Sequence, residues 1–453
     1  MRQLLLYTNY VLAGNTHNLK NFIGEYDLIM NTDNELLELL EDDEDYTYML
    51  DNMYGQHIIR DYTCQIDPEL QIVTDANSLI IAFDKAKKAS MWKQSTQHYE
   101  ANRLKETCKL KREVETNTYK QRVFRIFVIN ERGKTRYIRA LDVRDRVIQR
   151  ALCDEILTLR VQPHLIYDNG ASVKFKGQAF TEKRLVAHLQ KYFRKHGTKG
   201  YVLKLDFSKF FDNVIHEVLI QQLAKIIQSE STINLCKILI SSFDVDVSYM
   251  TDDEFKNCYS TLYNSLEHMK RDPSTLDFTK IMHKSIGIGS QISQICGLLY
   301  LSYDVDHYCK CCEHLEFYGR YADDLYIMDE SKERLITVFN NINARISARL
   351  GLFINMDKTQ IINLSQGFVF LKVHYKLEPT GKVLKIPSKS KINRERQKLP
   401  KFAKMIEEGK LTYKEVNDAY KSWRGTMTHY DCHNSLIRTD EFYFKVFGRR
   451  WDE

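Results

Sequence analysis

The sequence predicts an α+β fold in which a small antiparallel sheet is combined with many helices, and three observations lead to this prediction. Residues 201–205 are rich in strand formers and run straight into Asp206. Residues 317–328 contain two further strand-like runs around a tight polar turn at Asp323 and Asp324, the pattern of a β-hairpin. Apolar residues recur at helical spacing between and after these runs. The resulting order, strand–helix–helix–hairpin–helix–strand, is typical of a split βαβ arrangement.

The other elements follow in order along the chain. Residues 1–74 form an acidic N-terminal element of unknown fold, and residues 75–125 are expected to be mostly helical. A strand–turn–strand signal follows, and helices are then predicted by apolar spacing. A long polar stretch precedes a glycine-bearing loop, and further helices and strands complete the chain. The expected ranges are a hairpin from residues 123–133, helices at 142–160, 179–196, 291–310 and 332–350, a polar stretch at 244–283, a loop at 285–290, and strands at 352–354 and 368–371.

Composition limits the class of protein. The 453 residues are 43% hydrophobic and 28% charged, which is typical of a soluble globular chain with two to four substructures. No run is long enough to span a membrane, and the apolar patch at residues 4–7 is too short for a signal peptide. Ten cysteines without a disulfide-scaffold spacing favour a reducing cytoplasm. The group Cys309, Cys311, Cys312 and His314 lacks the spacing of a zinc site, so these cysteines are interpreted as thiols.

Charge is distributed unevenly although the net charge is only +6. Residues 27–51 hold ten acidic side chains and no Lys or Arg, whereas residues 382–404 hold nine basic side chains and one Glu. Either block alone would be a solvated helix face. Together they favour a polyanionic partner and a separate acidic N-terminal element.

Three aspartates form the candidate site. Asp206 ends one predicted strand, and Asp323 and Asp324 lie at the tip of a predicted hairpin. If these strands pair in one sheet, three carboxylates meet at one edge. Carboxylate oxygens are the ligands that Mg²⁺ prefers, and two such ions support phosphoryl transfer. Each aspartate alone is an ordinary turn residue, but the three on these elements favour a metal site.

These residues and several further motifs, in the same order along the chain, resemble those of reverse transcriptases, which are RNA-directed DNA polymerases. The resemblance covers roughly residues 80–440 and is strongest for the bacterial retron and group II intron-like lineage. The matching segments are residues 134–152, 168–177, 205–211, 285–294, 351–359 and 368–375.

The resemblance implies a right-hand architecture that is largely helical outside its palm. Residues 75–200 would be the fingers, and residues 201–380 the palm with a ferredoxin-like antiparallel sheet and the polar insert at 244–283. Residues 381–453 would be a helical thumb, opened by the basic run.

The resemblance also implies roles for individual residues. Asp206, Asp323 and Asp324 would bind two Mg²⁺ ions, for which Mn²⁺ is a possible substitute, and Lys358 would protonate the leaving pyrophosphate. Phe211 would exclude a ribose hydroxyl, although without the resemblance it would be read as a core aromatic. The residues implied in binding the dNTP are Arg136, Lys174, Phe211, Ile288 and Gly289, with Arg139 and Lys176 as less secure members. The residues implied in tracking nucleic acid are Lys385, Lys389, Lys391, Arg394 and Arg396.

The glycine-bearing loop departs from the pattern of many family members. Gly287 and Ile288 stand where these have a proline and a glutamine, and the glutamine helps position the template base. The form found here is more similar to that of phage-defence-associated and diversity-generating reverse transcriptases.

The prediction for function is therefore an enzyme that copies an RNA template into DNA from dNTPs in bacterial antiphage defence, with a dedicated non-coding RNA. An error-prone diversity-generating enzyme is the alternative. An alternative of another class is a non-catalytic palm that only binds RNA. The primer (RNA, DNA or a tyrosine) and a homo-oligomeric state are left open.

Overall fold

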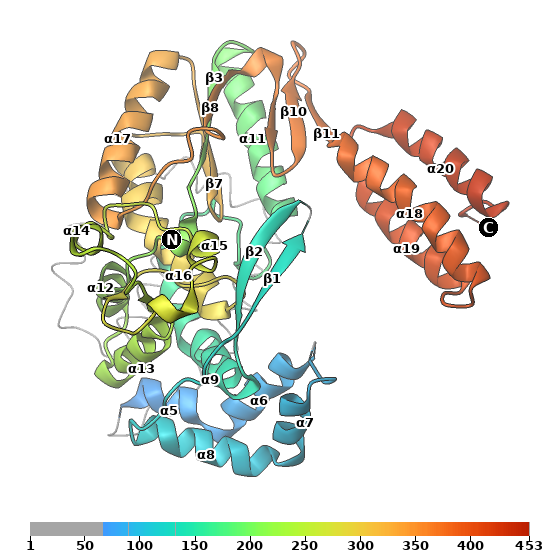
Figure 1. Cartoon of the computed structure of the whole chain (residues 1–453). Coiled ribbons are helices and arrows are strands. Elements are labelled where there is room, and N and C mark those ends of the chain that lie inside the picture. The colour runs from blue at the N-terminus through green and yellow to red at the C-terminus, as the bar shows by residue number, and fades with distance from the viewer. Residues whose placement is uncertain (1–66, 89, 132, 453) are drawn as a thin grey trace.

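The computed structural model describes residues 67–88, 90–131 and 133–452. The acidic block at residues 27–51 and nearly all of the 1–74 element therefore lie outside the described residues. In Figure 1 the described chain forms a large body with a separate bundle of three C-terminal helices beside it.

A helical layer forms one end of the body. Some of its helices begin at aspartate caps: the Asp75 carboxylate, for example, accepts hydrogen bonds from the backbone N–H groups of Asn77 and Ser78 and starts a new helix. Their apolar faces join the main core. The helices of this layer are α5 (Pro68–Thr74), α6 (Ala76–Lys87), α7 (Gln94–Ala101), α8 (Arg103–Glu115), α9 (Val143–Leu152) and α10 (Thr158–Val161).

A β-hairpin rises from this layer along the body (Figure 1). It consists of β1 (Arg125–Glu131) and β2 (Lys134–Ala140), paired in antiparallel register from Arg125 opposite Ala140 to Glu131 opposite Lys134. Gly133 in the tight turn has a φ of 76°, a conformation that glycine adopts without strain. The hairpin predicted from residues 123–133 is thus confirmed, with its first strand starting two residues later than expected.

The central sheet has the strand order β6-β7-β3-β8, and all its pairings are antiparallel. Alternate residues of each strand enter opposite cores: Leu203 and Leu205 of β3 face one core, and Val202 faces the other. Both faces of the sheet are therefore covered. The strands are β3 (Tyr201–Asp206), β6 (Tyr318–Tyr321), β7 (Asp324–Asp329) and β8 (Gln360–Asn363).

Helices cover the two faces of this sheet. The α17 helix (Lys332–Leu350) packs on one face and α11 (Gln178–His196) on the other (Figure 1). The α16 helix (Gln291–Leu301) continues as a π-helix, η5 (Ser302–Cys312). The helices expected at 179–196, 291–310 and 332–350 are confirmed, with the second of them changing to π-helical geometry.

One expected strand is wrong. Residues 352–354 make only an isolated bridge, between Ile354 and Phe207, and the strand that pairs with β3 is β8, which the sequence did not reveal. The reason is that β8, Gln-Ile-Ile-Asn, is short and half-polar, so it carries no strand signal of its own. Its position is set by pairing with β3.

The polar stretch 244–283 folds as a small unit, here called the insert. Helices α12 (His216–Ile226) and α13 (Glu230–Ser241) lead to it. Residues just inside its two ends pair as β4 (Val245–Asp246) and β5 (Ile281–Met282). Between them lie α14 (Asp252–Lys256) and α15 (Ser265–His268). It has a small core of its own, formed by Val245, Val247, Cys258, Tyr263 and Met282.

A second, three-stranded sheet joins the body to the C-terminal bundle. Its strand order is β11-β10-β9, with β9 (Phe368–Phe370), β10 (Val373–Leu377) and β11 (Val383–Pro387). The bundle that follows consists of α18 (Lys389–Glu407), α19 (Tyr413–Met427) and α20 (His433–Phe447). Within the bundle, Leu399, Tyr420 and Tyr443 form a buried core.

No helix in the described part of the chain combines the length and the apolar character that crossing a membrane requires.

Candidate active site

The register of the central sheet brings the three aspartates together. Asp206, the last residue of β3, lies directly opposite Asp324, the first residue of β7. Tyr321 also pairs with Asp324, so Ala322 and Asp323 form a two-residue hairpin loop. Ala322 has a φ of 55°, the left-handed conformation that such tight hairpin turns require. Asp206, Asp323 and Asp324 therefore lie at one edge of the sheet, as the sequence predicted.

The three carboxylates repel one another in partly buried surroundings. Burial raises the pKa of Asp324 to about 6, with further contributions from the charges of Asp323 and Asp206. Burial and the charge of Asp206 also raise the pKa of Asp323. Nearby cations offset only part of this. A set of hard oxygen donors with too little positive charge around it fits a divalent cation.

One cation does pair with this cluster. The Nζ atom of Lys358 lies 2.7 Å from Oδ2 of Asp206. The chain around it is held by backbone bonds, since the N–H of Asn355 donates to the Asp206 carbonyl (2.8 Å) and the N–H of Thr359 donates to the Asn355 carbonyl (3.0 Å). The Lys358 side chain is 53% exposed, so it is free to move away from Asp206 when another cation takes its place.

A buried ion pair supports the hairpin from below, and sequence reasoning missed it. Arg320 of β6 and Asp306 of the π-helix are both fully buried and paired through two bonds, Nε to Oδ1 (2.7 Å) and Nη2 to Oδ2 (2.5 Å). The same guanidinium donates through Nη1 to the Ala322 carbonyl (2.9 Å). Arg320 thereby holds the loop that carries Asp323. The available signal was a lone arginine inside an otherwise apolar and aromatic strand.

Residues 168–176 dock beside the same hairpin. The N–H of Arg320 donates to the Asp168 carbonyl (3.0 Å), and the N–H of Gly170 donates to the Arg320 carbonyl (3.1 Å). This segment places Lys174 on the surface next to the hairpin, with its Nζ over the Phe175 ring.

The neighbouring Lys176 does not fit the contact with a triphosphate that the resemblance suggested for it. Its Nζ donates to the Tyr167 carbonyl (2.7 Å) and lies over the Tyr167 and Phe180 rings. Burial lowers its pKa to about 8. The side chain is thus engaged within the protein as an internal brace.

The β1–β2 hairpin reaches the carboxylates. The charge of Lys134, at the start of β2, is close enough to lower the pKa of Asp323 against the effect of burial. Arg136 lies two residues further along β2 and is half-buried. Arg139 is buried and donates to the Phe243 carbonyl (2.7 Å), so it anchors the strand. Lys134 is a second residue that sequence reasoning did not assign to the site.

The aromatic pair after β3 and the glycine-bearing loop lie against each other. The N–H of Ile286 donates to the Phe211 carbonyl (2.9 Å). Phe210 is buried, whereas Phe211 is half-buried at the edge of the core. Gly297 of α16 makes room for both rings, because a Cβ there would lie 3.1 Å from Phe210 and 3.5 Å from Phe211.

Ile288 and Gly289 occupy the outer part of that loop. Ile288 is half-buried and Gly289 is exposed, with a φ of 106° that favours glycine. A Cβ at Gly289 would lie 3.9 Å from the Ile138 side chain of β2. The loop therefore lies next to the hairpin that carries Arg136.

The cations of the C-terminal region have three kinds of surroundings. Lys389 and Arg394 of α18 are exposed. Lys385 and Lys391 lie over the Tyr430 ring, at 5.4 and 4.7 Å. The Arg396 guanidinium donates to Thr439 Oγ1 (3.0 Å) and to the Ser435 carbonyl (3.3 Å), so it ties α18 to α20.

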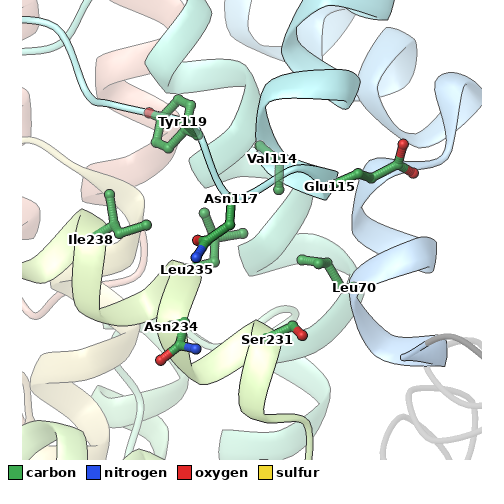
Figure 2. Close-up of a pocket in the computed structure, with 9 residues that line it drawn as sticks. All are labelled: Leu70, Val114, Glu115, Asn117, Tyr119, Ser231, Asn234, Leu235 and Ile238. Carbon is green, nitrogen blue, oxygen red and sulfur yellow. The ribbon is translucent and has the colours of Figure 1, made fainter.

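A small pocket lies away from the carboxylates, between α5, the end of α8 and α13 (Figure 2). Its lining contains a single carboxylate, Glu115, which accepts a hydrogen bond from Thr74 Oγ1 (3.0 Å) and pairs with Lys111. The pocket therefore lacks the set of acidic groups found at the sheet edge. Its lining residues are Leu70, Val114, Glu115, Asn117, Tyr119, Ser231, Asn234, Leu235 and Ile238.

Comparison with known proteins identifies the family. The profile of the family described as "Reverse transcriptase (RNA-dependent DNA polymerase)" matches residues 120–376. The chain belongs to this family, and so to a class of nucleotidyltransferases that use divalent metal ions.

A curated relative and two solved structures are also similar. The COX1/OXI3 intron 2 protein of Saccharomyces cerevisiae is 23% identical over 69% of this chain, which spans 39% of that protein's length. A telomerase structure from Candida tropicalis, truncated of its C-terminal domain, has a TM-score of 0.42 at 16% identity and covers 58% of this chain and 54% of the other. A telomerase from Candida albicans with a fragment of telomeric RNA has a TM-score of 0.39 at 14% identity, covering 74% and 62%.

Proposed function

We propose that this protein is an RNA-directed DNA polymerase that extends a primer with dNTPs on an RNA template. The observation that carries the proposal is the register of β3 and β7, which sets Asp206 opposite Asp324 with Asp323 in the adjoining turn. Membership of the reverse transcriptase family supports the same reaction.

The three carboxylates are proposed to hold two Mg²⁺ ions. When bound, such ions activate the attacking hydroxyl and stabilise the leaving oxygen of an in-line phosphoryl transfer. Asp206, Asp323 and Asp324 supply oxygen ligands from a rigid sheet edge, which keeps their geometry fixed. In the overall reaction the primer 3′-oxygen forms a bond to the α-phosphorus, and the bond from that phosphorus to pyrophosphate breaks.

Lys358 is proposed to deliver the proton that the leaving pyrophosphate takes up. Its ammonium pairs with Asp206 at 2.7 Å, and a cation bound by Asp206 would displace it. The displaced side chain is exposed and mobile, and it remains next to the reacting phosphates. General acid catalysis requires such a proton donor within reach of the leaving oxygen.

The nucleotide is proposed to lie between the β1–β2 hairpin and the sheet edge. Arg136 and Lys174 would meet the triphosphate, the first with a bidentate fork and the second with a mobile point charge. The Phe211 ring would pack against C2′ of the sugar and exclude a ribose hydroxyl. Ile288 and Gly289 would form the surface beneath the base.

The nucleic acid is proposed to run past the C-terminal bundle. In this assignment residues 75–200 are fingers, residues 201–380 a palm and residues 381–453 a thumb. Lys389 and Arg394 are exposed on α18 and would contact backbone phosphates. Lys385 and Lys391 would contribute from the Tyr430 side, and Arg396 chiefly by holding the bundle together.

The proposal is tested by supplying dNTPs and Mg²⁺ to the protein with its co-purified RNA and sequencing the product. DNA that depends on Asp323 supports the proposal. The matched control is Asp329→Asn, because Asp329 ends the same strand β7 at its other end. Absence of DNA from the wild-type protein, or equal synthesis by Asp323→Asn, would refute it. Absence of DNA from the wild-type protein would favour a protein that only binds RNA.

For the biological role we favour antiphage defence with a dedicated non-coding RNA as template. The form of the loop, with Gly287 and Ile288, supports this role and also supports the second candidate, error-prone copying for sequence diversification. Two measurements separate them: plaque formation on cells carrying wild-type or Asp323→Asn protein, and the error spectrum of the DNA. Protection that requires Asp323 supports defence, whereas frequent errors transferred to a genomic target support diversification.

A further inference from the structure

The two ends of the insert meet at a cluster of metal-ligating side chains that the polymerase reaction does not use. His216 begins α12, Asp244 precedes β4 and His283 follows β5. The Nδ1 atom of His216 lies 2.9 Å from Oδ1 of Asp244, and the Nδ1 atom of His283 lies 2.9 Å from Oδ2 of the same carboxylate. One ligand atom from each residue falls within 4.8 Å of the others.

His216 is buried with an unsatisfied nitrogen pointing into this cluster. The residue is 3% exposed, and neither its Nδ1 nor the facing Oδ1 of Asp244 makes a hydrogen bond. A buried polar atom that makes no hydrogen bond is costly, and these two atoms face each other at 2.9 Å without one. A cation that accepts lone pairs from both atoms satisfies both at once.

The other ring nitrogen of His216 is arranged as in metal-binding histidines. Nε2 lies 2.5 Å from the Ser285 carbonyl oxygen, and because a carbonyl only accepts, Nε2 carries the proton. In the neutral ring the lone pair is then on Nδ1, toward Asp244. Metal-ligating histidines regularly donate their second ring N–H to a carbonyl or carboxylate, which fixes the tautomer.

We propose that His216, Asp244 and His283 bind a zinc ion. Two imidazole nitrogens and a carboxylate are a ligand set for a borderline cation such as Zn²⁺, whereas Mg²⁺ prefers oxygen alone. Ligand atoms about 2.1 Å from one ion lie about 3.0–3.4 Å apart at right or tetrahedral angles. The two distances of 2.9 Å, each to a different oxygen of the Asp244 carboxylate, are close to the lower end of that range. A water molecule would complete the coordination.

Such an ion would clip the insert to the body of the protein. Asp244 and His283 are the first and last residues of the insert, so binding both to His216 closes the loop between them. Backbone bonds reinforce the same junction, since the N–H of His216 donates to the His283 carbonyl (3.1 Å). The clip would also act on the loop beneath the proposed nucleotide site through the bond from His216 to Ser285. Ser285 has a φ of 92°, a strained conformation that needs support.

The first experiment titrates the full-length protein with Zn²⁺ in excess Mg²⁺, which occupies the hard carboxylate site, and measures stoichiometry and affinity by calorimetry. The wild type should bind one equivalent of Zn²⁺. The affinity should fall more than about 100-fold in His283→Ala, because loss even of a residue that only supports a metal ligand lowers the affinity by up to that factor. The His283 side chain is 58% exposed, so its removal leaves the fold intact. The matched control is His98→Ala, whose side chain is 68% exposed on α7.

Substitution with Co²⁺ separates this cluster from the cysteines at the end of the π-helix. A site built from His216, Asp244 and His283 shows visible d–d bands without thiolate charge-transfer absorption. These bands should disappear in Asp244→Asn. Strong thiolate absorption retained in His283→Ala would show that the ion is bound by cysteines instead and would overturn the proposal.

The second experiment measures what the ion does to the insert. Trypsin cleavage at Lys256, Lys270, Arg271 and Lys280 should slow when Zn²⁺ is added to the wild type and stay unchanged in His283→Ala. Equal zinc affinity in wild type and His283→Ala, or no binding by the wild type, would contradict the site. Neither readout depends on DNA synthesis, so failure here leaves the proposed polymerase function untouched.

Discussion

Two sets of aspartates, one buried and one partly buried, lie at the β6–β7 hairpin, and they differ in how their charge is balanced. In the first set, Asp306 is paired with Arg320 through two hydrogen bonds. Asp168 accepts a hydrogen bond from Arg184 Nε (2.7 Å), and His188 and Lys310 lie near it. In the second set, Asp323 and Asp324 share their edge with Asp206.

Asp168 in the first set shows a pKa shift opposite to those of Asp323 and Asp324 in the second. The pKa of Asp168 is held low by His188, Lys310 and Arg184 despite burial. The pKa values of Asp323 and Asp324 are raised by burial and by neighbouring carboxylates. A carboxylate that the protein neutralises itself serves the architecture. A carboxylate left without enough cations is poised for a ligand that brings positive charge.

The largest expected effect is a loss of DNA synthesis in Asp323→Asn without a loss of stability. Asp323→Asn should lower DNA synthesis at least about 10³-fold, about 4 kcal/mol of transition-state free energy, because a proposed metal ligand is lost. Its free energy of unfolding without Mg²⁺ should stay equal or rise, since a repelling charge is removed. Primer extension and urea unfolding measure the two, with Asp329→Asn as control. A destabilised Asp323→Asn protein would contradict the comparison.

For Asp306, whose charge is balanced by Arg320, we expect the opposite result: a loss of stability. Asp306→Asn should lower the free energy of unfolding by about 3–5 kcal/mol, because it leaves the Arg320 guanidinium buried without its counter-charge. The measurement is urea unfolding at neutral pH. The double change Asp306→Leu with Arg320→Met, which removes both charges, should be milder. A loss below about 1 kcal/mol for Asp306→Asn would show that Asp306 and Arg320 are not the support inferred here.

Lys358 is the cation that pairs with Asp206 in the described part of the site, so it partly balances the charge of the three aspartates. Lys358→Ala should slow nucleotide addition about 10²-fold through loss of a general acid. Stability should change little, since the Lys358 side chain is half-exposed. Single-turnover rates over a range of pH measure the effect, and Lys204→Ala on the same sheet edge is the comparison. Unchanged rates would leave Lys358 only the role of counter-ion.

A change at Phe211 tests whether a nucleotide sugar binds next to Asp206, Asp323 and Asp324. Phe211→Ala should relax the preference for dNTP over rNTP about tenfold, about 1.4 kcal/mol, because the ring no longer opposes the ribose hydroxyl. Competition between dNTP and rNTP in primer extension measures it, with the exposed Phe278→Ala as control. An unchanged ratio removes Phe211 from the nucleotide site.

Two pH dependences of opposite sign, measured without divalent ions, complete the comparison. The folded-state pKa of Asp324 lies near 6 against 3.8 when unfolded, so the folded state binds more protons between these values. Wild-type stability should fall relative to Asp324→Asn as pH rises from about 4 to 6, then level off.

For Asp168 the folded-state pKa is lowered, so its contribution to stability is complete above about pH 4 and is lost as pH falls below it. The gap between wild type and Asp168→Asn should therefore narrow only in acid. If the stability difference from wild type changed with pH in the same direction for Asp324→Asn and Asp168→Asn, the distinction between the two sets of aspartates would be wrong.

Much of the fold could be predicted because local patterns agree with it. The apolar spacing of residues 332–350 predicted α17 with its bounds, and strand formers on both sides of Asp323 predicted the β6–β7 hairpin. By contrast, β8 has little pattern of its own, and its place depends on pairing with β3. The insert was read as polar because its core is small.

What the sequence determined by itself is the set of chemical groups and their order: Asp206 at a strand end, Asp323 and Asp324 at a turn, and Lys358 after the next helix. These are local features, set by strand propensity, turn geometry and the family motifs. Only the tertiary structure decided which charges meet. The pairing of β3 with β7 sets Asp206 opposite Asp324, the π-helix carries Asp306 to Arg320, and the closure of the insert joins His216, Asp244 and His283. Such contacts join residues far apart in the chain, so no spacing in the sequence encodes them.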